Sequence, residues 1–116
     1  MGTYDYYEVE VKIKKLSHCK KATGVKKQGG REIWFPGDMP FDTVMLMVRQ
    51  FGEINGTQLV HIDAVELLYP FLKVEAQMLK LALPGRILES SGRYPLRITK
   101  LNDLLVDIQP LNHYDD

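Results

Sequence analysis

The sequence predicts an α+β fold, in which a mostly antiparallel sheet carries one or two helices packed on one face. Two observations predict this class. Apolar and polar residues alternate with period two near both ends of the chain, and residues 37–52 follow the period of an amphipathic helix. The expected order begins strand, strand, helix, strand, and a β-hairpin closes the chain. A length of 116 residues fits a single domain over residues 1–116.

The first strand is expected within residues 7–16. Its residues Val9, Val11 and Ile13 alternate with charged side chains, which is typical of a strand with one buried face. Residues 17–30 show no periodicity and end in a Gly-Gly pair, so they are expected to form an extended connection or a long hairpin tip.

The second strand is expected at residues 31–36. Ile33 and Phe35 would lie on one face of this strand and Trp34 on the other, because successive side chains alternate. The proline at position 36 ends the strand, since proline cannot donate to a ladder of hydrogen bonds.

The clearest helix is expected over residues 37–52. Asp38 is a candidate cap, Pro40 suits the first turn and Gly52 is a natural stop. The apolar stripe of this helix consists of Phe41, Val44, Met45 and Val48.

The second half of the chain is expected to return to strands. Alternation predicts one strand over residues 58–66, and residues 85–111 read as short strands joined by tight turns. The turn at Asn102 and Asp103 would lead into the closing hairpin. The tail, 112–116, is expected to be frayed.

Residues 71–82 fit two interpretations. Their apolar residues alternate as in a strand, but nearly all of them are strong helix formers, and prolines flank the segment. We predict a helix. Such a helix has more apolar surface than a thin two-layer domain covers, so part of it is expected to face a second subunit or another protein.

Charge is distributed unevenly along this neutral chain. The formal net charge is zero, yet residues 11–31 hold seven lysines, one arginine and no acid. Residues 1–35 contain eight basic and four acidic residues, and residues 36–116 contain seven basic and eleven acidic ones. A segregation of this kind says more about partners than the net charge does.

The basic arm, residues 11–31, predicts binding of nucleic acid or another polyanion. Lysines neutralise phosphates and release counterions, and an aromatic side chain nearby offers a base a stacking surface. The alternative is that the lysines protect a sheet edge and that Trp34 is buried under a helix. The expected contact residues are Lys14, Lys15, Lys20, Lys21, Lys26, Lys27, Arg31 and Trp34.

A second hypothesis is a protein-interaction module, such as a small regulator, an inhibitor or an assembly subunit. Its basic arm would dock on the acidic surface of a partner, or the acidic half of one copy would bind another copy to form a homo-oligomer. We favour binding of nucleic acid or another polyanion, and we rank the interaction module second and an enzyme third.

No motif in the chain predicts catalytic residues, a metal site or a cofactor. His18 and Cys19 are neighbours that would point to opposite faces of an extended chain, so the thiol is expected to be passive. His61 and Asp63 would share one face of a strand, but no third ligand accompanies them. The sequence favours a non-enzymatic protein and leaves an enzyme open, because active sites assemble from distant residues.

The sequence also predicts a cytoplasmic location and no membrane partner. No apolar run approaches the roughly 20 residues of a membrane helix, and no basic leader precedes an apolar run.

Overall fold

The computed structural model describes residues 8–14, 18–26, 29–52 and 54–111, and for 8–14, 23–26 and 29–31 it describes the backbone alone. These residues contain strands β1 to β7 and helices α1 to α3. The predicted α+β class, with mostly antiparallel strands, packed helices and a closing hairpin, is confirmed. The chain forms two compact units, Met1–Asn55 and Gly56–Asp116. The single domain stays a prediction.

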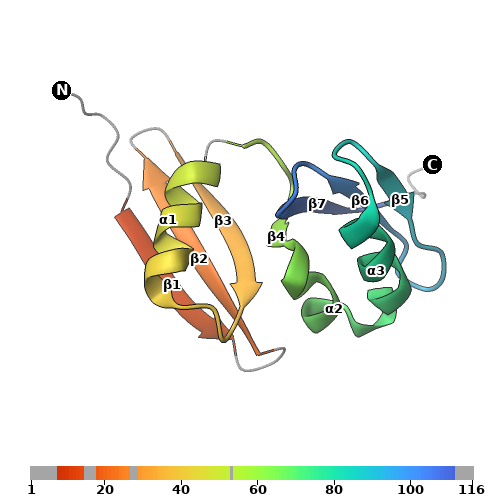
Figure 1. Ribbon diagram of the computed structural model, residues 1–116, viewed down its shortest axis with the longest axis horizontal. Helices are drawn as coiled ribbons and strands as arrows, with labels where there is room; N and C mark the ends of the chain where they lie inside the picture. The colour runs from red at the N-terminus through yellow and green to blue at the C-terminus, as the bar shows by residue number, and fades with distance from the viewer. Residues whose placement is uncertain (1–7, 15–17, 27–28, 53, 112–116) are drawn as a thin grey trace. The chain divides into compact units, whose positions relative to one another are not determined.

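The described part of the first unit is an antiparallel sheet with a helix on one face (Figure 1). Strand β2 lies between β1 and β3 and pairs with both, and helix α1 contacts β1 and β2. The elements are β1 (Glu8–Lys14), β2 (Cys19–Lys26), β3 (Gly29–Pro36) and α1 (Phe41–Phe51).

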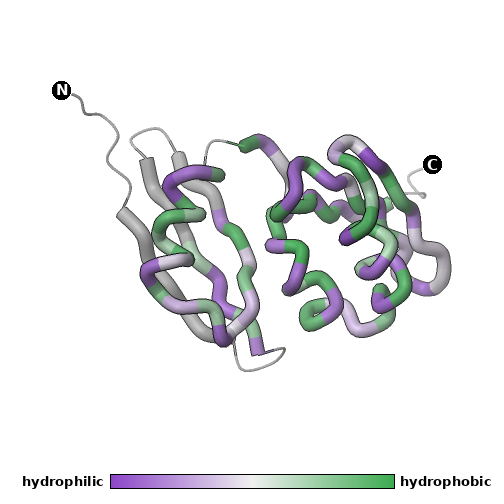
Figure 2. The backbone as a smooth tube through the Cα atoms, viewed as in Figure 1, coloured by the Kyte–Doolittle hydropathy of each residue, from purple (hydrophilic) through white to green (hydrophobic). Residues whose placement is uncertain are grey.

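The core of the first unit lies between α1 and the sheet. In β3, Ile33 and Phe35 are fully buried, and Ile33 pairs with Ala22 of β2, which is also buried. Figure 2 shows hydrophobic residues along β3 and α1. Burying one large apolar side chain contributes about 1.5–3 kcal/mol, so this layer holds the helix on the sheet. The helix contributes Val44, Val48 and Phe51.

Strand β2 corrects the prediction of a connection or hairpin tip over residues 17–30. The unit therefore begins strand, strand, strand, helix. The alternation of apolar and polar residues was hidden because Lys20 occupies an inward position, opposite the buried Phe35 of β3 and two residues before the buried Ala22. Pairing with a neighbour on each side outweighs the weak local preference, as strand formation depends strongly on context.

Helix α1 begins later than predicted. The N-cap is Pro40, which makes no side-chain capping bond, so the prediction that Asp38 caps the helix is wrong. The chain first makes a turn after β3, in which the amide of Met39 donates to the carbonyl of Pro36 at 3.1 Å. That turn places Asp38 ahead of the helix.

The second unit is an antiparallel sheet with strand order β4-β7-β6-β5 and helices on one face (Figure 1). The Asn102 side chain accepts hydrogen bonds from the amides of Leu104 and Leu105, which fixes the predicted turn between β6 and β7. The strands are β4 (Leu59–His61), β5 (Ile87–Glu89), β6 (Leu96–Lys100) and β7 (Leu105–Pro110).

Strand β4 is shorter than the predicted strand over 58–66. The chain turns after His61 into a 3₁₀ turn, η1 (Ile62–Ala64), and then into helix α2 (Val65–Leu68). The imidazole Nδ1 of His61 accepts the amide hydrogen of Asp63 at 3.1 Å. This local bond replaces a ladder bond and ends the strand, as capping side chains do.

The predicted helix over residues 71–82 is confirmed. It consists of a 3₁₀ turn, η2 (Pro70–Leu72), followed by helix α3 (Lys73–Leu81). Leu72, Ala76 and Leu79 recur at helical spacing and are buried. Among the described residues, no helix is long and apolar enough to cross a membrane.

Candidate interaction surfaces

The basic arm forms much of the sheet of the first unit. Lys14 ends β1 opposite Cys19, Lys26 ends β2 opposite Gly29, and Arg31 lies in β3. Lys15 and Lys27 lie outside the described residues, as does the tail, residues 112–116. The structure thus gives the strand positions of these three residues. For Lys20, Lys21 and Trp34, which also lie on strands, it describes the side chains as well.

Lys21 and Trp34 are direct partners across β2 and β3. The Lys21 ammonium lies 5.8 Å from the centroid of the Trp34 ring and 3.4 Å from Oε2 of Glu32. Trp34 is half-buried, whereas its neighbours Ile33 and Phe35 are fully buried, so the alternation predicted for this strand is confirmed. The two predicted residues share one face, where Glu32 partly neutralises the lysine.

Lys20 lies on the opposite face of β2 from Lys21, because neighbours on a strand alternate. Its ammonium donates a hydrogen bond to the carbonyl oxygen of Met39 at 2.6 Å, in the turn before α1. A lysine held in this way positions the helix, so the arm divides its charges between the two faces of the sheet.

Cys19 is fully buried at the start of β2. Burial raises the pKa of its thiol above the ordinary value, so the protonated form dominates at neutral pH. The predicted passive thiol agrees with this placement. The preceding residue, His18, has a positive φ of 53° and accepts a hydrogen bond from the amide of Gly37 at 2.8 Å.

His61 and Asp63 lie close together in the turn that follows β4. The carboxylate of Asp63 is 3.9 Å from Nδ1 of His61, while the imidazole is buried and the carboxylate is exposed. Burial lowers the pKa of His61, and the charge of Asp63 opposes part of that shift. In the described part of the chain, no group of three or more His, Cys, Asp and Glu side chains could hold a metal.

Helix α3 carries apolar residues on the side turned away from the core. This side follows the spacing i, i+3, i+7, i+10, beginning one residue before the buried Leu72. The residues of α3 and their exposed fractions are Val74 at 67%, Met78 at 44% and Leu81 at 90%, and Phe71, at 57%, precedes them in the 3₁₀ turn η2. A helix that is apolar on two sides is normally covered on both, so this one lacks a covering in the single chain.

Two shallow hollows run along the same helix. The first, of about 330 Å³, lies between Phe71, Glu75 and the turn at residues 90–94, which includes Tyr94. The second, of about 260 Å³, is lined by Met78 and Leu81 together with residues at and before β5. Both hollows lie between the helical segment and the β5–β6 hairpin. We define the α3 surface as Phe71, Val74, Met78, Leu81 and Tyr94.

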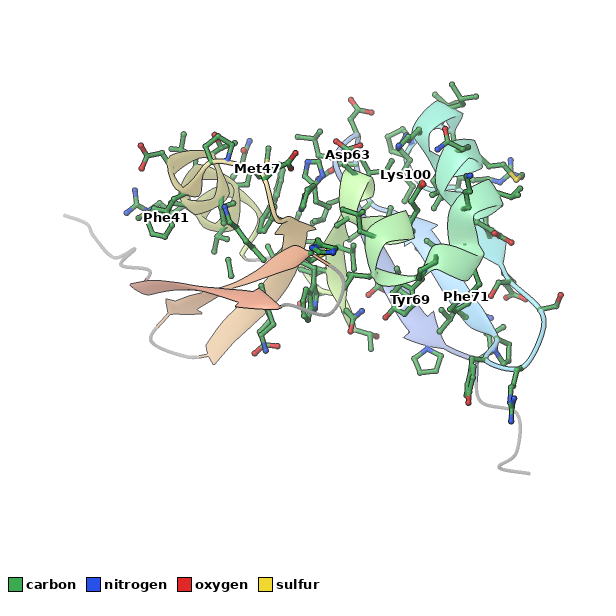
Figure 3. All side chains as sticks on the ribbon, turned by 90° about the horizontal axis from the view of Figure 1, so that it is seen from below. Phe41, Met47, Asp63, Tyr69, Phe71 and Lys100 are labelled. Atoms are coloured by element: carbon green, nitrogen blue, oxygen red, sulfur yellow. The ribbon has the colours of Figure 1, made fainter. Side chains whose placement is uncertain are left out.

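Lys100 anchors α3, and the sequence reasoning missed it. This residue of β6 is only 3% exposed, and its ammonium donates to the carbonyl oxygens of Leu79 at 2.8 Å and Ala82 at 2.6 Å. Figure 3 labels Lys100 beside the helix. A cation at a helix C-terminus satisfies carbonyls that lack partners there. The sequence did carry a signal for this burial, because Lys100 is two residues after the buried Ile98 and side chains two apart on a strand point to the same face.

Comparisons with known protein families, with curated proteins and with solved structures found no match for this chain. Two surfaces of the described residues are candidates for function, the Lys21–Trp34 pair and the α3 surface.

Proposed function

We propose that this protein is a protein-interaction module that binds another protein surface through the α3 surface. One observation carries the proposal: α3 buries Leu72, Ala76 and Leu79 beneath it and exposes a second apolar stripe outward. Phe71 packs edge-on against Tyr69 at 5.9 Å between ring centroids, but the stripe still leaves much apolar area in solvent, and such patches mark contacts with other proteins.

The area of the α3 surface supports this proposal. The two aromatic residues, Phe71 and Tyr94, have side chains of about 150–250 Å² each, and with the three smaller residues the exposed parts together present on the order of 700 Å². The largest apolar patch of a typical monomer covers about 300–600 Å². One side of a standard interface covers about 800 Å², which the α3 surface approaches.

The rigidity of α3 supports the same proposal. Lys100 fixes the end of the helix from below, and the Gln77 amide donates to the Glu66 carboxylate of α2 at 3.2 Å. A helix held at its end and along its side presents its outer face with little loss of entropy on binding.

Photo-crosslinking tests this proposal. A benzophenone amino acid at Val74 should form adducts with a specific protein inside cells, and the same group at Asp103, exposed in the β6–β7 turn, should not. The adducts should disappear when Leu81→Glu is added, because a carboxylate in an apolar contact is costly. Equal adducts at both positions, or none at Val74, would contradict the proposal.

A second candidate function is polyanion binding, favoured by the Lys21–Trp34 pair. The side chains lie 5.8 Å apart on one face, and Lys12 stands opposite Lys21 in the register of β1 and β2. A charge beside an aromatic ring suits the stacked bases of a single strand. Glu32 weakens this candidate, because it already pairs with Lys21 at 3.4 Å. A cytoplasmic location and an acidic protein partner for the arm also stay predictions.

The single tryptophan of the chain makes this candidate directly measurable. Titration with a single-stranded oligonucleotide should quench Trp34 fluorescence, with an affinity that falls steeply as salt rises. Lys21→Ala should weaken binding several-fold, and Lys73→Ala, an exposed lysine on α3, should leave it unchanged. Equal loss in both variants, or no quenching, would sink this candidate.

A further inference from the structure

We infer that the partner on the α3 surface is a second copy of this chain, through antiparallel two-fold packing of α3 on α3. The inference rests on the proposed function and names the occupant of the same surface. The first support is the spacing. Phe71, Val74, Met78 and Leu81 are separated by three, four and three residues, which is the spacing of the apolar seam between paired helices.

The seam is complementary to itself. A two-fold axis at the level of residue 76, on the exposed side of the helix and away from the buried Ala76, places Phe71 opposite Leu81 of the second copy and Val74 opposite its Met78. The larger side chains at the two ends would then meet each other, and the small valine would meet the flexible methionine, which adapts to irregular gaps. Closed two-fold interfaces require such a surface, in which one patch serves both partners.

Charge permits this pairing. The formal net charge of the chain is zero and its pI is about 6.8, so two copies do not repel each other near neutral pH. The charged residues of α3, which are Lys73, Glu75 and Lys80, include both signs, and the Lys80 ammonium lies 3.8 Å from the Asp63 carboxylate. No block of like charge borders the seam on this helix.

The paired area is adequate for a dimer of moderate affinity. Two α3 surfaces of on the order of 700 Å² each would, if covered completely, bury an area near the lower end of the 1,200–2,000 Å² of stable interfaces. Tyr94 extends the contact beyond the helix, since it shares a hollow with Phe71. We expect a dissociation constant of about micromolar, and not a nanomolar one, because the seam is short and mostly aliphatic.

Light scattering on the purified full chain over a range of concentrations tests the inference. The expected mass at high concentration is 26.6 kDa, twice the 13.3 kDa of one chain. Leu81→Glu should weaken dimerisation at least about 100-fold, because it would bury an unpaired carboxylate. The matched control is Leu46→Glu on α1, another strongly exposed helical leucine, which should leave the dimer intact.

Disulfide trapping tests the register. A mixture of Val74→Cys and Met78→Cys chains should form a disulfide between copies faster than a mixture of Val74→Cys and Leu46→Cys chains. Cys19 is fully buried and should not compete. Equal rates in the two mixtures would overturn the antiparallel packing.

The two proposals can fail separately. A monomer at all concentrations, or a dimer that Leu81→Glu and Leu46→Glu affect equally, would overturn the second copy as the occupant. If the chain is a monomer while the benzophenone at Val74 captures a different protein, the interaction module stands and its partner is another protein. If Val74 captures nothing and no dimer forms, both proposals fail.

Discussion

Gly37 lies where the chain leaves β3, and there is no room there for a larger residue. A Cβ at this position would lie 2.4 Å from the carbonyl oxygen of His18, and the Gly37 amide already donates to that oxygen. The backbone fixes the position of the Cβ and the oxygen belongs to the main chain, so rotating a side chain cannot relieve the contact. This single contact joins the start of β2 to the end of β3.

Gly37→Ala should destabilise the protein by about 1–3 kcal/mol, because the backbone must shift and the hydrogen bond to His18 must lengthen. The matched control is Gly52→Ala. Gly52 has a φ of −63° in the right-handed helical region, where alanine is neutral or slightly stabilising. Urea unfolding measures both variants. Equal changes in the free energy of unfolding in the two variants would contradict a stabilising role for the Gly37 contact.

His61 makes stability depend on pH. Burial lowers its pKa in the folded protein below the ordinary value of 6.5, so the unfolded chain binds a proton at a pH where the folded protein does not. The unfolded state therefore holds more protons in this window, and stability must fall as pH falls below about 6.5. The loss ends once pH is below the folded pKa.

His61→Asn should flatten this dependence, since the amide oxygen can still accept the Asp63 amide hydrogen but does not titrate. The free energy of unfolding, measured by urea between about pH 7.5 and pH 5, should decrease in the wild type more than in the variant. Parallel curves would contradict the assignment of His61 as the group responsible.

At the scale of elements, α3 depends on a residue of another element. The ammonium of Lys100 is the donor for two carbonyls at the end of this helix, Leu79 and Ala82. Few side chains combine the length and the three donors that the position needs.

Lys100→Met should destabilise the protein by about 1–3 kcal/mol, because methionine keeps most of the volume but leaves both carbonyls without this donor. Hydrogen exchange should also increase in the last turn of α3. Lys73→Met is the control, since Lys73 is exposed on the same helix and its loss should be nearly neutral. No difference between the variants would mean that Lys100 does not hold the helix.

The sequence was informative for some elements and silent for others. The helical periods of α1 and α3 and the turn at Asn102 could be predicted, because their determining residues are neighbours in the chain. Strand β2 could not, because its pairing partners come from both sides and its inward Lys20 disrupts the pattern. The end of β4 at His61 depends on a side-chain hydrogen bond that competes with the ladder.

The candidate surfaces were predicted to different degrees for the same reason. An outward apolar side of residues 71–82 was expected from composition, but its position required the buried side, Leu72, Ala76 and Leu79, to be known. The basic arm was visible in the sequence at once. The separation of Lys20 from Lys21 was not, because it required a strand where none was predicted.

In the molecule as a whole, α3 offers a surface for contact with other proteins, while the buried residues hold the fold together. Leu81 is 90% exposed and Leu46 is 64% exposed in the single chain. Neither contributes appreciably to the core, so cysteine at either position should leave the free energy of unfolding within about 0.5 kcal/mol of the wild type. A cysteine at position 81 therefore reports whether a partner covers the α3 surface, and a cysteine at position 46 on α1 is its matched control.

The most direct test is the rate of maleimide labelling of Leu81→Cys and Leu46→Cys in cells that contain the protein at its natural level. Exposure in the single chain alone would make position 81 react at least as fast as position 46. We expect the reverse, because a covered α3 surface should protect position 81 several-fold, and urea should abolish the protection. If position 81 reacts as fast as position 46 without urea, nothing covers the α3 surface and the central claim is wrong.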